Sequence, residues 1–327
     1  MSSLPEIDVA AARRRIAGIA VRTPLMPSLP LSERLGVEVH LKLEVVQPTA
    51  AFKLRGAASK VMALSDDERA RGVITASTGN HGRCVAYVAR RLGIPATVCV
   101  SSGVPAGKLQ ALEDVGAVVE VVGDSQNDAL ERALAIAEQD DVTFIHPFDD
   151  PDIIAGQATA SAEIAEDLPD VKTVLAPLSG GGLLAGVAAG LAQYAPAAEA
   201  VGVSMTRVPL MKMSLDAGHP VDAAEEETLA DSLRGGIGLD NRFTFPMVRD
   251  LVRRVVLVDE EAIWEGMRFL FEKHRLIAEG AAAVGVAALL EGLVDPLNGP
   301  VVAIITGANA EPDHIAQLVT GAPPPPL

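Results

Sequence analysis

Short apolar segments alternate with longer amphipathic ones between residues 66 and 146, and this alternation restricts the fold more than any other feature of the sequence. The short segments are rich in Val, Ile and Thr and predict β-strands, whereas the longer ones have helical spacing. We expect strands at residues 72–75, 96–100, 117–122 and 143–146, with helices at 82–92, 108–115 and 128–138 between them. Strands and helices that alternate at these lengths form a parallel sheet with right-handed crossovers. This part of the chain therefore predicts an α/β fold.

The same alternation is expected in the rest of the chain. Further strands are predicted at 37–43, 173–176, 200–203, 255–258 and 301–305, and helices at 7–19, from 53 to about 64, 153–165, 183–194, 260–274 and 281–290. Apolar residues make up 49% of the sequence and aromatic ones only 3%, so aliphatic side chains must fill the core. This composition suits open parallel sheets flanked by helices. A chain of 327 residues is long enough for two domains.

Charge and cysteine content argue against several classes of protein. The net charge of −16 would repel a nucleic-acid backbone. Cys84 and Cys99 are too few for a disulfide framework and fit a reducing compartment. The N-terminus has acidic residues where a secretory signal would be basic, and Pro177 with three glycines interrupts the uncharged stretch 173–198. We therefore expect a soluble, cytoplasmic protein with no nucleic-acid or membrane partner.

Lys53 stands among apolar neighbours in the segment Thr-Ala-Ala-Phe-Lys-Leu-Arg-Gly at residues 49–56. An apolar environment lowers the pKa of a lysine, and the neutral amine is the nucleophile that Schiff-base chemistry requires. The alternative is a lysine that extends its amine from a helix start into water. The other lysines lie mostly in polar or solvated-looking surroundings: Lys42, Lys60, Lys108, Lys172, Lys212 and Lys273.

Two turns that each follow a predicted strand and open a helix suit anion binding. Ser-Thr-Gly-Asn-His-Gly at residues 77–82 can offer free backbone N–H groups to a carboxylate, and Asn80 adds an amide. Ser-Gly-Gly-Gly-Leu at residues 179–183 can fold around a phosphate, although no P-loop lysine follows. The first turn has a plainer interpretation as a tight strand-to-helix connection with a Ser or Thr cap, and the second as a mere turn, for which a run of three glycines is uncommon.

Other polar residues follow strands near the end of the chain. Thr306, in Thr-Gly-Ala-Asn, follows the last predicted strand and places a hydroxyl at the same sheet edge. Glu279 interrupts an apolar stretch and either lines a cleft or caps a helix. His81 and Cys84 are three residues apart, but no second pair accompanies them, so we expect no metal site.

These motifs, in this order and spacing, resemble those of the fold-type II pyridoxal-phosphate enzymes, whose fold is similar to that of the tryptophan synthase β-subunit. The likeness extends from about residue 23 to residue 309, and the branch it resembles contains threonine dehydratase and serine racemase. The resemblance implies that Lys53 carries pyridoxal phosphate as a Schiff base and acts as the catalytic base. It also implies two domains: a large cofactor-binding one of residues 1–68 and 150–327, and a small mobile one of residues 69–149.

The resemblance also implies a role for each motif. Phe52 would lie beneath the cofactor ring, Asn80 would bond its 3-hydroxyl, and Thr306 would face the pyridine nitrogen. The phosphate would be held by Ser179, Gly180, Gly181, Gly182 and Leu183. The substrate would be bound by Ser77, Thr78, Gly79, His81 and Arg83. A hydroxyl at the pyridine nitrogen weakens the electron sink and favours prompt β-elimination of water from a hydroxy amino acid.

Departures from the family pattern narrow the activity. Thr78 stands where serine racemases have a serine, and Arg83 stands where the branch usually has glutamine. Ser179 replaces the usual first glycine of the phosphate loop, and the strand at 202–205 lacks the acid of the usual divalent-metal site. Residues 202–205 and 231–245 look most like the hydroxyectoine-utilisation dehydratases. Candidate contacts for a second anionic group on the substrate are Arg83, Arg207, Arg234 and Arg242.

The expected substrate is therefore a hydroxy amino acid: one derived from hydroxyectoine, 3-hydroxyaspartate, or threonine or serine. Alternatives are a β-replacement enzyme similar to cysteine synthase, an amino-acid racemase, and a non-catalytic protein that binds pyridoxal phosphate or an ectoine. The resemblance also implies a homodimer.

Overall fold

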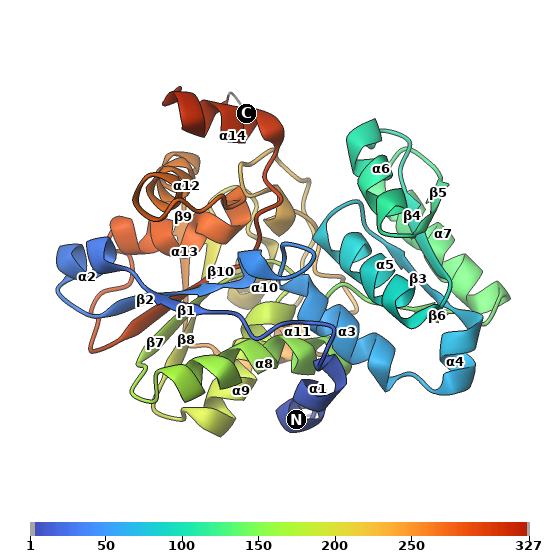
Figure 1. The fold of residues 1–327 in the computed structure, drawn as a ribbon, viewed down its shortest axis with the longest axis horizontal. Helices are drawn as coiled ribbons and strands as arrows, with labels where there is room; N and C mark the ends of the chain where they lie inside the picture. The colour runs from blue at the N-terminus through green and yellow to red at the C-terminus, as the bar shows by residue number, and fades with distance from the viewer. Residues whose placement is uncertain (1–3, 326–327) are drawn as a thin grey trace.

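The computed structural model describes residues 4–325, which form two α/β units side by side (Figure 1). The larger sheet has six strands in the order β1–β2–β10–β7–β8–β9. Their bounds are β1 (Leu25–Pro27), β2 (Val39–Leu43), β7 (Thr173–Pro177), β8 (Glu199–Met205), β9 (Arg254–Val258) and β10 (Val301–Ile305). Neighbouring strands are parallel, except that β1 runs antiparallel to β2. The carboxyl ends of the parallel strands therefore meet along one edge.

Helices cover both faces of this sheet and form a core with each. One face carries α1 (Val9–Ile16), α8 (Pro151–Asp167), α9 (Gly182–Tyr194), α10 (Leu210–Ala217) and α11 (Thr244–Leu251). The other carries α2 (Leu29–Leu35), α12 (Glu260–His274), α13 (Gly280–Leu290) and α14 (Pro312–Thr320). In β10, Val302 and Ile304 belong to the first core and Val301, Ala303 and Ile305 to the second. The alternating side chains of the strand thus serve both layers.

The smaller sheet has four parallel strands in the order β5–β4–β3–β6. Its strands are β3 (Val73–Ala76), β4 (Ala96–Val100), β5 (Val118–Val121) and β6 (Thr143–Phe144), and its helices are α4 (Asp66–Arg71), α5 (Asn80–Leu92), α6 (Ala106–Asp114) and α7 (Gln126–Gln139). Between the two sheets lies α3 (Lys53–Ala63), which contacts both α5 and α8. Lys53 therefore lies where the two units meet.

Most predicted elements are confirmed. The strands at 96–100 and 301–305 and the helix at 260–274 have the predicted bounds, and most others differ by one to three residues. The strand predicted at 143–146 ends at Phe144, and the helix predicted at 7–19 ends at Ile16. The sequence did not indicate β1, α2, α4, α10, α11, α14, or the 3-10 turns η1 (Glu44–Val46) and η2 (Asp231–Leu233). These elements are short, and α4, which buries no residue, has no apolar period that could have predicted it.

The uncharged stretch at 173–198 contains β7, a glycine loop and the buried helix α9, as predicted. Within residues 4–325, no helix is both long enough and apolar enough to cross a membrane.

Candidate active site

Lys53 is the first residue of α3 and follows a turn that is bonded to the end of β10. Ala50 in this turn has a left-handed backbone (φ 55°), which is uncommon for a residue with a side chain. Ala51 pairs with Gly307, and the Phe52 N–H donates to the Thr306 carbonyl oxygen at 2.9 Å. Two of the motifs predicted to act together, residues 49–56 and 306–309, are thus adjacent.

The Lys53 side chain is partly buried, and its Nζ donates a hydrogen bond to the Pro147 carbonyl oxygen at 2.8 Å. Burial lowers the pKa of Lys53 to about 8, although Cys84 and Glu279 act in the opposite direction. An amine with this pKa is neutral often enough near pH 8 to act as a nucleophile. The amine ends on a backbone carbonyl, so the alternative in which it extends into bulk water does not describe this lysine.

A directed chain of hydrogen bonds connects the start of α5 with the large unit. Asn80 Nδ2 donates to both carboxylate oxygens of Glu279 at 3.0 Å, and Asn309 Nδ2 donates to Asn80 Oδ1 at 2.6 Å. Arg83 donates in turn to Asn309 Oδ1 at 2.8 Å, and Asn309 also donates to the Thr49 carbonyl at 3.2 Å. Arginine only donates, so Arg83 orients the Asn309 amide, and Asn309 Nδ2 in turn orients the Asn80 amide. Burial raises the pKa of Glu279.

The glycine loop at residues 179–183 connects β7 to the N-terminus of α9. Gly181 has a left-handed backbone (φ 88°). A Cβ on Gly180 would lie 2.3 Å from Phe148 Cδ1, and one on Gly182 would lie 3.0 Å from Phe148 Cα. Phe148 directly follows Pro147, whose carbonyl accepts the hydrogen bond from Lys53. The glycine loop and Lys53 therefore both contact residues 147–148.

The turn before α5 separates into an open part and a buried part. Ser77 and Thr78 are partly buried and Gly79 is exposed. His81 points inward: it is only 3% exposed, and its Nε2 lies 3.0 Å from the Ile145 carbonyl oxygen. Burial, and then the charge of Lys53, lower the pKa of His81 to about 3, so its ring is neutral at physiological pH.

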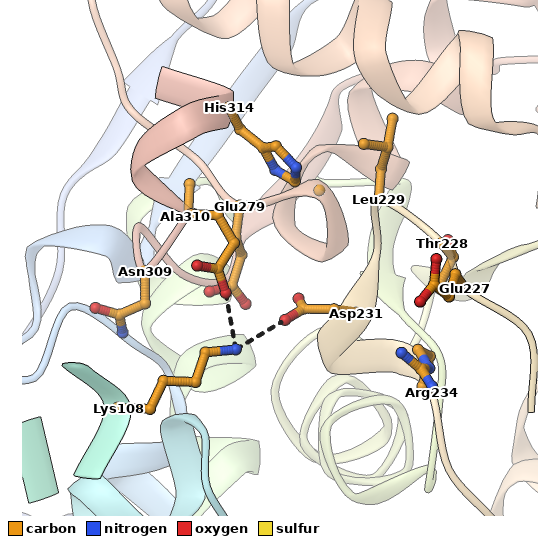
Figure 2. A pocket seen from close by; sticks show the side chains of 12 residues that line it. Lys108, Glu227, Thr228, Leu229, Asp231, Arg234, Glu279, Asn309, Ala310 and His314 are labelled. Atoms are coloured by element: carbon orange, nitrogen blue, oxygen red, sulfur yellow. Dashed lines mark ion pairs between the residues drawn. The ribbon is translucent and has the colours of Figure 1, made fainter. Parts of the chain in front are cut away.

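The hydrogen-bonded series of Arg83, Asn309, Asn80 and Glu279 is called the Asn80 chain below. A cavity of about 240 Å³ adjoins it (Figure 2). Glu279 and Asn309 line it, so Glu279 lies between Asn80 and the cavity. Lys108 reaches in from α6, where its Nζ lies 2.8 Å from Glu311 Oε1 and 3.9 Å from Asp231 Oδ2. Glu279 therefore lines a cleft. It is also the residue before α13, but its side chain makes no capping hydrogen bond.

Residues 16–307 match the family described as "Pyridoxal-phosphate dependent enzyme". The chain belongs to this family. A candidate threonine dehydratase of Sinorhizobium fredii is 47% identical over 321 residues, which cover 98% of this chain and 97% of that protein. The L-threonine ammonia-lyase of Thermotoga maritima is 40% identical over 312 residues, covering 95% of this chain and 77% of that protein.

Solved structures of this pyridoxal-phosphate family give the same result for the fold. The processed threonine deaminase isoform 2 of Solanum lycopersicum has a TM-score of 0.89 at 34% identity, covering 95% of this chain and 91% of that chain. Maize serine racemase has a TM-score of 0.91 at 31% identity and covers 98% of both chains. The predicted fold-type II architecture, the pyridoxal-phosphate cofactor and the likeness to the threonine dehydratase and serine racemase branch are therefore confirmed.

The donors at this site suit the cofactor of the pyridoxal-phosphate family. A lysine with a pKa of about 8 can condense with an aldehyde. The glycine loop gives α9 a free N-terminus, the usual binding place for a phosphate. No side chain could be added at Gly180 or Gly182 without displacing Phe148. Among residues 4–325, no three His, Cys, Asp or Glu side chains cluster closely enough to hold a metal ion.

The four arginines considered for a second anionic group lie in different places. Arg83 belongs to the Asn80 chain, and Arg234 lines the cavity with its guanidinium 3.4 Å from Glu225. Arg207 lies at a second hollow beside Trp264. The Arg242 side chain lies over the Phe243 ring. The structure thus leaves Arg83 and Arg234 near the site.

The prediction that the lysines other than Lys53 lie mostly in polar or solvated surroundings is wrong for Lys42. Lys42 is fully buried in β2, and its Nζ donates to Glu163 Oε2 at 2.6 Å. Glu163 lies on α8, far away in the sequence, so no local pattern around Lys42 could have indicated this partner.

Sequence reasoning also missed Pro147, Phe148 and Lys108 as parts of the site. Their segments carried a weak signal at most: the first two open a proline-bounded passage between the units, and Lys108 begins a predicted helix. Only the folded chain places them beside Lys53, the glycine loop and Glu279.

Proposed function

We propose that this enzyme removes water from a β-hydroxy amino acid and releases a 2-oxo acid and ammonia. The observation that carries the proposal is the position of Lys53, whose amine has a pKa of about 8 where the two units meet. The named relatives support a hydroxy amino acid substrate, since they include an L-threonine ammonia-lyase and a threonine deaminase.

Each predicted cofactor residue has a place in this proposal. Bound pyridoxal phosphate supplies an electron sink for the negative charge that develops at the substrate Cα. Lys53 would attach the cofactor aldehyde, Phe52 would lie against its ring, and Asn80, once released from Glu279, would donate to the 3-oxygen. Thr306 would face the ring nitrogen as a neutral hydroxyl. The loop at 179–183 would hold the phosphate at the N-terminus of α9.

The chain also supplies the groups that handle the substrate. Ser77, Thr78 and Gly79 offer hydroxyls and N–H groups to the substrate carboxylate at the start of α5. His81 fixes this turn through the Ile145 carbonyl. Lys53, once free, takes the Cα proton as a general base. The β-hydroxyl gains a proton and leaves as water, and the resulting enamine tautomerises and is hydrolysed without further help from the protein.

The finer substrate assignment is a hydroxy amino acid with a second polar group, such as one derived from hydroxyectoine or 3-hydroxyaspartate. It is supported by the likeness at residues 202–205 and 231–245 and by Arg234 at the cavity. We also propose that residues 69–149 move as a small domain against residues 1–68 and 150–327. The bond from Lys108 to Glu311 would then form on closure. A homodimer remains part of the proposal.

Purified holoenzyme would be assayed for ammonia and 2-oxo acid release from several substrates. The panel contains L-threonine, L-serine, both diastereomers of 3-hydroxyaspartate and hydrolysed hydroxyectoine. Selective turnover of the last two kinds supports the finer assignment, whereas fast turnover of threonine or serine alone refutes it and keeps the dehydratase reaction. If none turns over while added sulfide yields a β-substituted amino acid, or if only racemisation occurs, the proposed elimination is wrong.

Lys53→Ala tests the assigned catalytic residue directly. We expect the variant to lose both turnover and the visible absorption band of the bound cofactor, while Lys60→Ala on the same helix keeps the band. A Lys53→Ala protein with an unchanged band would contradict the assignment.

A further inference from the structure

Four charged side chains are buried together beneath the start of α3: Lys42, Glu44, Arg55 and Glu163. They come from β2, η1, α3 and α8. Two are cations and two are carboxylates, so the cluster is neutral when all four are ionised. The proposed chemistry uses none of them. We call this group the buried ionic cluster.

Arg55 is the centre of the buried ionic cluster. Its Nε and Nη2 donate to the two Glu44 carboxylate oxygens at 2.8 and 2.9 Å. Its Nη1 and Nη2 donate to the two Glu163 oxygens at 2.7 and 2.8 Å. Nη1 also donates to Thr159 Oγ1 at 3.0 Å, and Nη2 lies 3.3 Å from Thr23 Oγ1. The planar guanidinium thus binds both carboxylates in pairs, a geometry that an ammonium cannot reproduce.

The remaining members complete the hydrogen bonds of the two carboxylates. Lys42 Nζ donates to Glu163 Oε2 at 2.6 Å and to the Thr23 carbonyl at 2.7 Å. Glu44 accepts from Thr23 Oγ1 at 2.6 Å and from Gln47 Nε2 at 3.1 Å. Buried ion pairs lose hydration and often stabilise a protein no more than apolar residues of the same volume. Their directional bonds instead fix the geometry of the segments that carry them.

The first turn of α3 is what the cluster holds. Arg55 follows Lys53 by two residues, and both belong to that turn. The backbones of α3 and α8 also touch here: a Cβ on Gly156 would lie 2.4 Å from the Arg55 carbonyl oxygen, and one on Gly56 would lie 2.4 Å from Gln157 Nε2. The turn therefore cannot rotate or slide without breaking bonds of Arg55 or moving α8.

The segment before Lys53 is held just as firmly from the opposite side. Ala50 has a left-handed backbone, a strained conformation that persists only where its surroundings impose it. Its carbonyl accepts from the Ala308 N–H at 3.0 Å, and the Phe52 N–H donates to Thr306. Lys53 is thus clamped between the loop after β10 and the buried ionic cluster.

We propose that Arg55 is a positioning residue for Lys53, aiming its amine by bonding the first turn of α3 to Glu44 and Glu163 in pairs. The inference rests on the proposed function of Lys53. A positive charge alone could come from a lysine. Fixing the direction of α3 requires the paired bonds to Glu44 and Glu163, which only an arginine can make. A small error in the direction of Lys53 would move its amine away from the position in which it can take the proton from the substrate Cα.

Arg55→Lys tests this inference, with Lys42→Met as its matched control. Arg55→Lys keeps the positive charge but loses the paired bonds. Lys42→Met removes a cation from the same cluster but lies on β2, and it leaves the acceptors of Arg55 in place. The holoenzymes would be compared by thermal melting, by kcat and KM, and by the pH midpoint of the visible absorption band of bound pyridoxal phosphate.

Both variants should melt at lower temperature. Arg55→Lys should in addition lower kcat by about 10- to 100-fold, change KM much less, and move the pH midpoint of the band. Lys42→Met should leave kcat within about twofold and the midpoint unchanged. If Arg55→Lys changes only the melting temperature, or if both variants change kcat and the midpoint in proportion to their loss of stability, the role is structural and the inference is wrong.

Thr159→Val keeps the test decisive should Arg55→Lys fail to fold. It removes one uncharged acceptor of Arg55 and nearly preserves volume. We expect a smaller shift of the midpoint in Thr159→Val, and an unchanged midpoint would count against the inference. Lys53→Ala separates the two proposals: a band that survives it overturns the proposed function, whereas an unmoved midpoint in the Arg55 and Thr159 variants overturns only the positioning role.

Discussion

Replacing Lys53 with methionine should stabilise the cofactor-free protein at pH 7 and should cease to do so at high pH. An ordinary lysine has a pKa of 10.5, and burial lowers that of Lys53 to about 8. At roughly 1.4 kcal/mol per pH unit, this gap makes the protonated amine cost about 3 kcal/mol of folding free energy at pH 7. Methionine fills a similar volume without charge but loses the bond to Pro147, worth about 1 kcal/mol.

The expected gain in the free energy of unfolding is therefore about 2 kcal/mol at pH 7. Between pH 8 and 10.5 the folded wild type has released the Lys53 proton while the unfolded chain still binds it. Wild-type stability consequently rises with pH in this window relative to the variant. Above pH 10.5 the amine is neutral in both states, and Lys53→Met should then be about 1 kcal/mol less stable than wild type.

Urea unfolding of both proteins, freed of pyridoxal phosphate, at pH 7, 9 and 11 measures this change of sign. Lys60→Met on the same helix is the control with the opposite expectation. Burial lowers the pKa of Lys60, but its bond to Asp150 at 2.7 Å outweighs burial and raises it. Lys60→Met should therefore be destabilising at pH 7, and its loss should shrink as pH rises through the raised pKa. A Lys53→Met protein that is no more stable than wild type at pH 7, or whose advantage is the same at pH 11, would refute the reasoning.

Three further predictions concern other parts of the site. Gly180→Ala should lower the free energy of unfolding by about 1–3 kcal/mol and weaken pyridoxal-phosphate binding, because its Cβ would lie 2.3 Å from Phe148 Cδ1. Thermal melting and a cofactor titration measure the two effects, and unchanged binding would contradict the role of the loop. Glu279→Gln should raise the free energy of unfolding of the cofactor-free protein at pH 7, because burial raises the pKa of Glu279 and its charge destabilises the folded state. This gain should vanish as the pH falls to 4.5, where the carboxyl takes up a proton. A gain that persists at pH 4.5 in urea unfolding would show another cause. Lys108→Met should change the free energy of unfolding by less than about 1 kcal/mol, because the ion pairs of Lys108 are solvent-exposed. The variant should raise KM if α6 closes the site, and an unchanged KM in steady-state assays would contradict closure through this residue.

Much of this protein could be predicted from its sequence because the relevant signals are local. The two-residue and 3.6-residue periods of apolar side chains specify strands and helices wherever they are long enough, as in β4, β10 and α12. A glycine run directly after a strand marks a turn that opens a helix, and the order of the motifs around Lys53, Asn80 and Thr306 specifies the family.

Tertiary structure alone decided which distant groups meet. No local pattern connects Lys53 with the Pro147 carbonyl, Asn80 with Glu279, or Arg55 with Glu163, because each pair is formed by segments that only the folded chain brings together. Burial is likewise a property of the whole fold. It lowers the pKa of Lys53, and it encloses Lys42, whose neighbours in the sequence gave no sign of a buried partner. The sequence thus determined the elements and the chemistry that they carry, while packing determined the electrostatic environment in which that chemistry operates, since desolvation and pairing depend on all the segments around a charge.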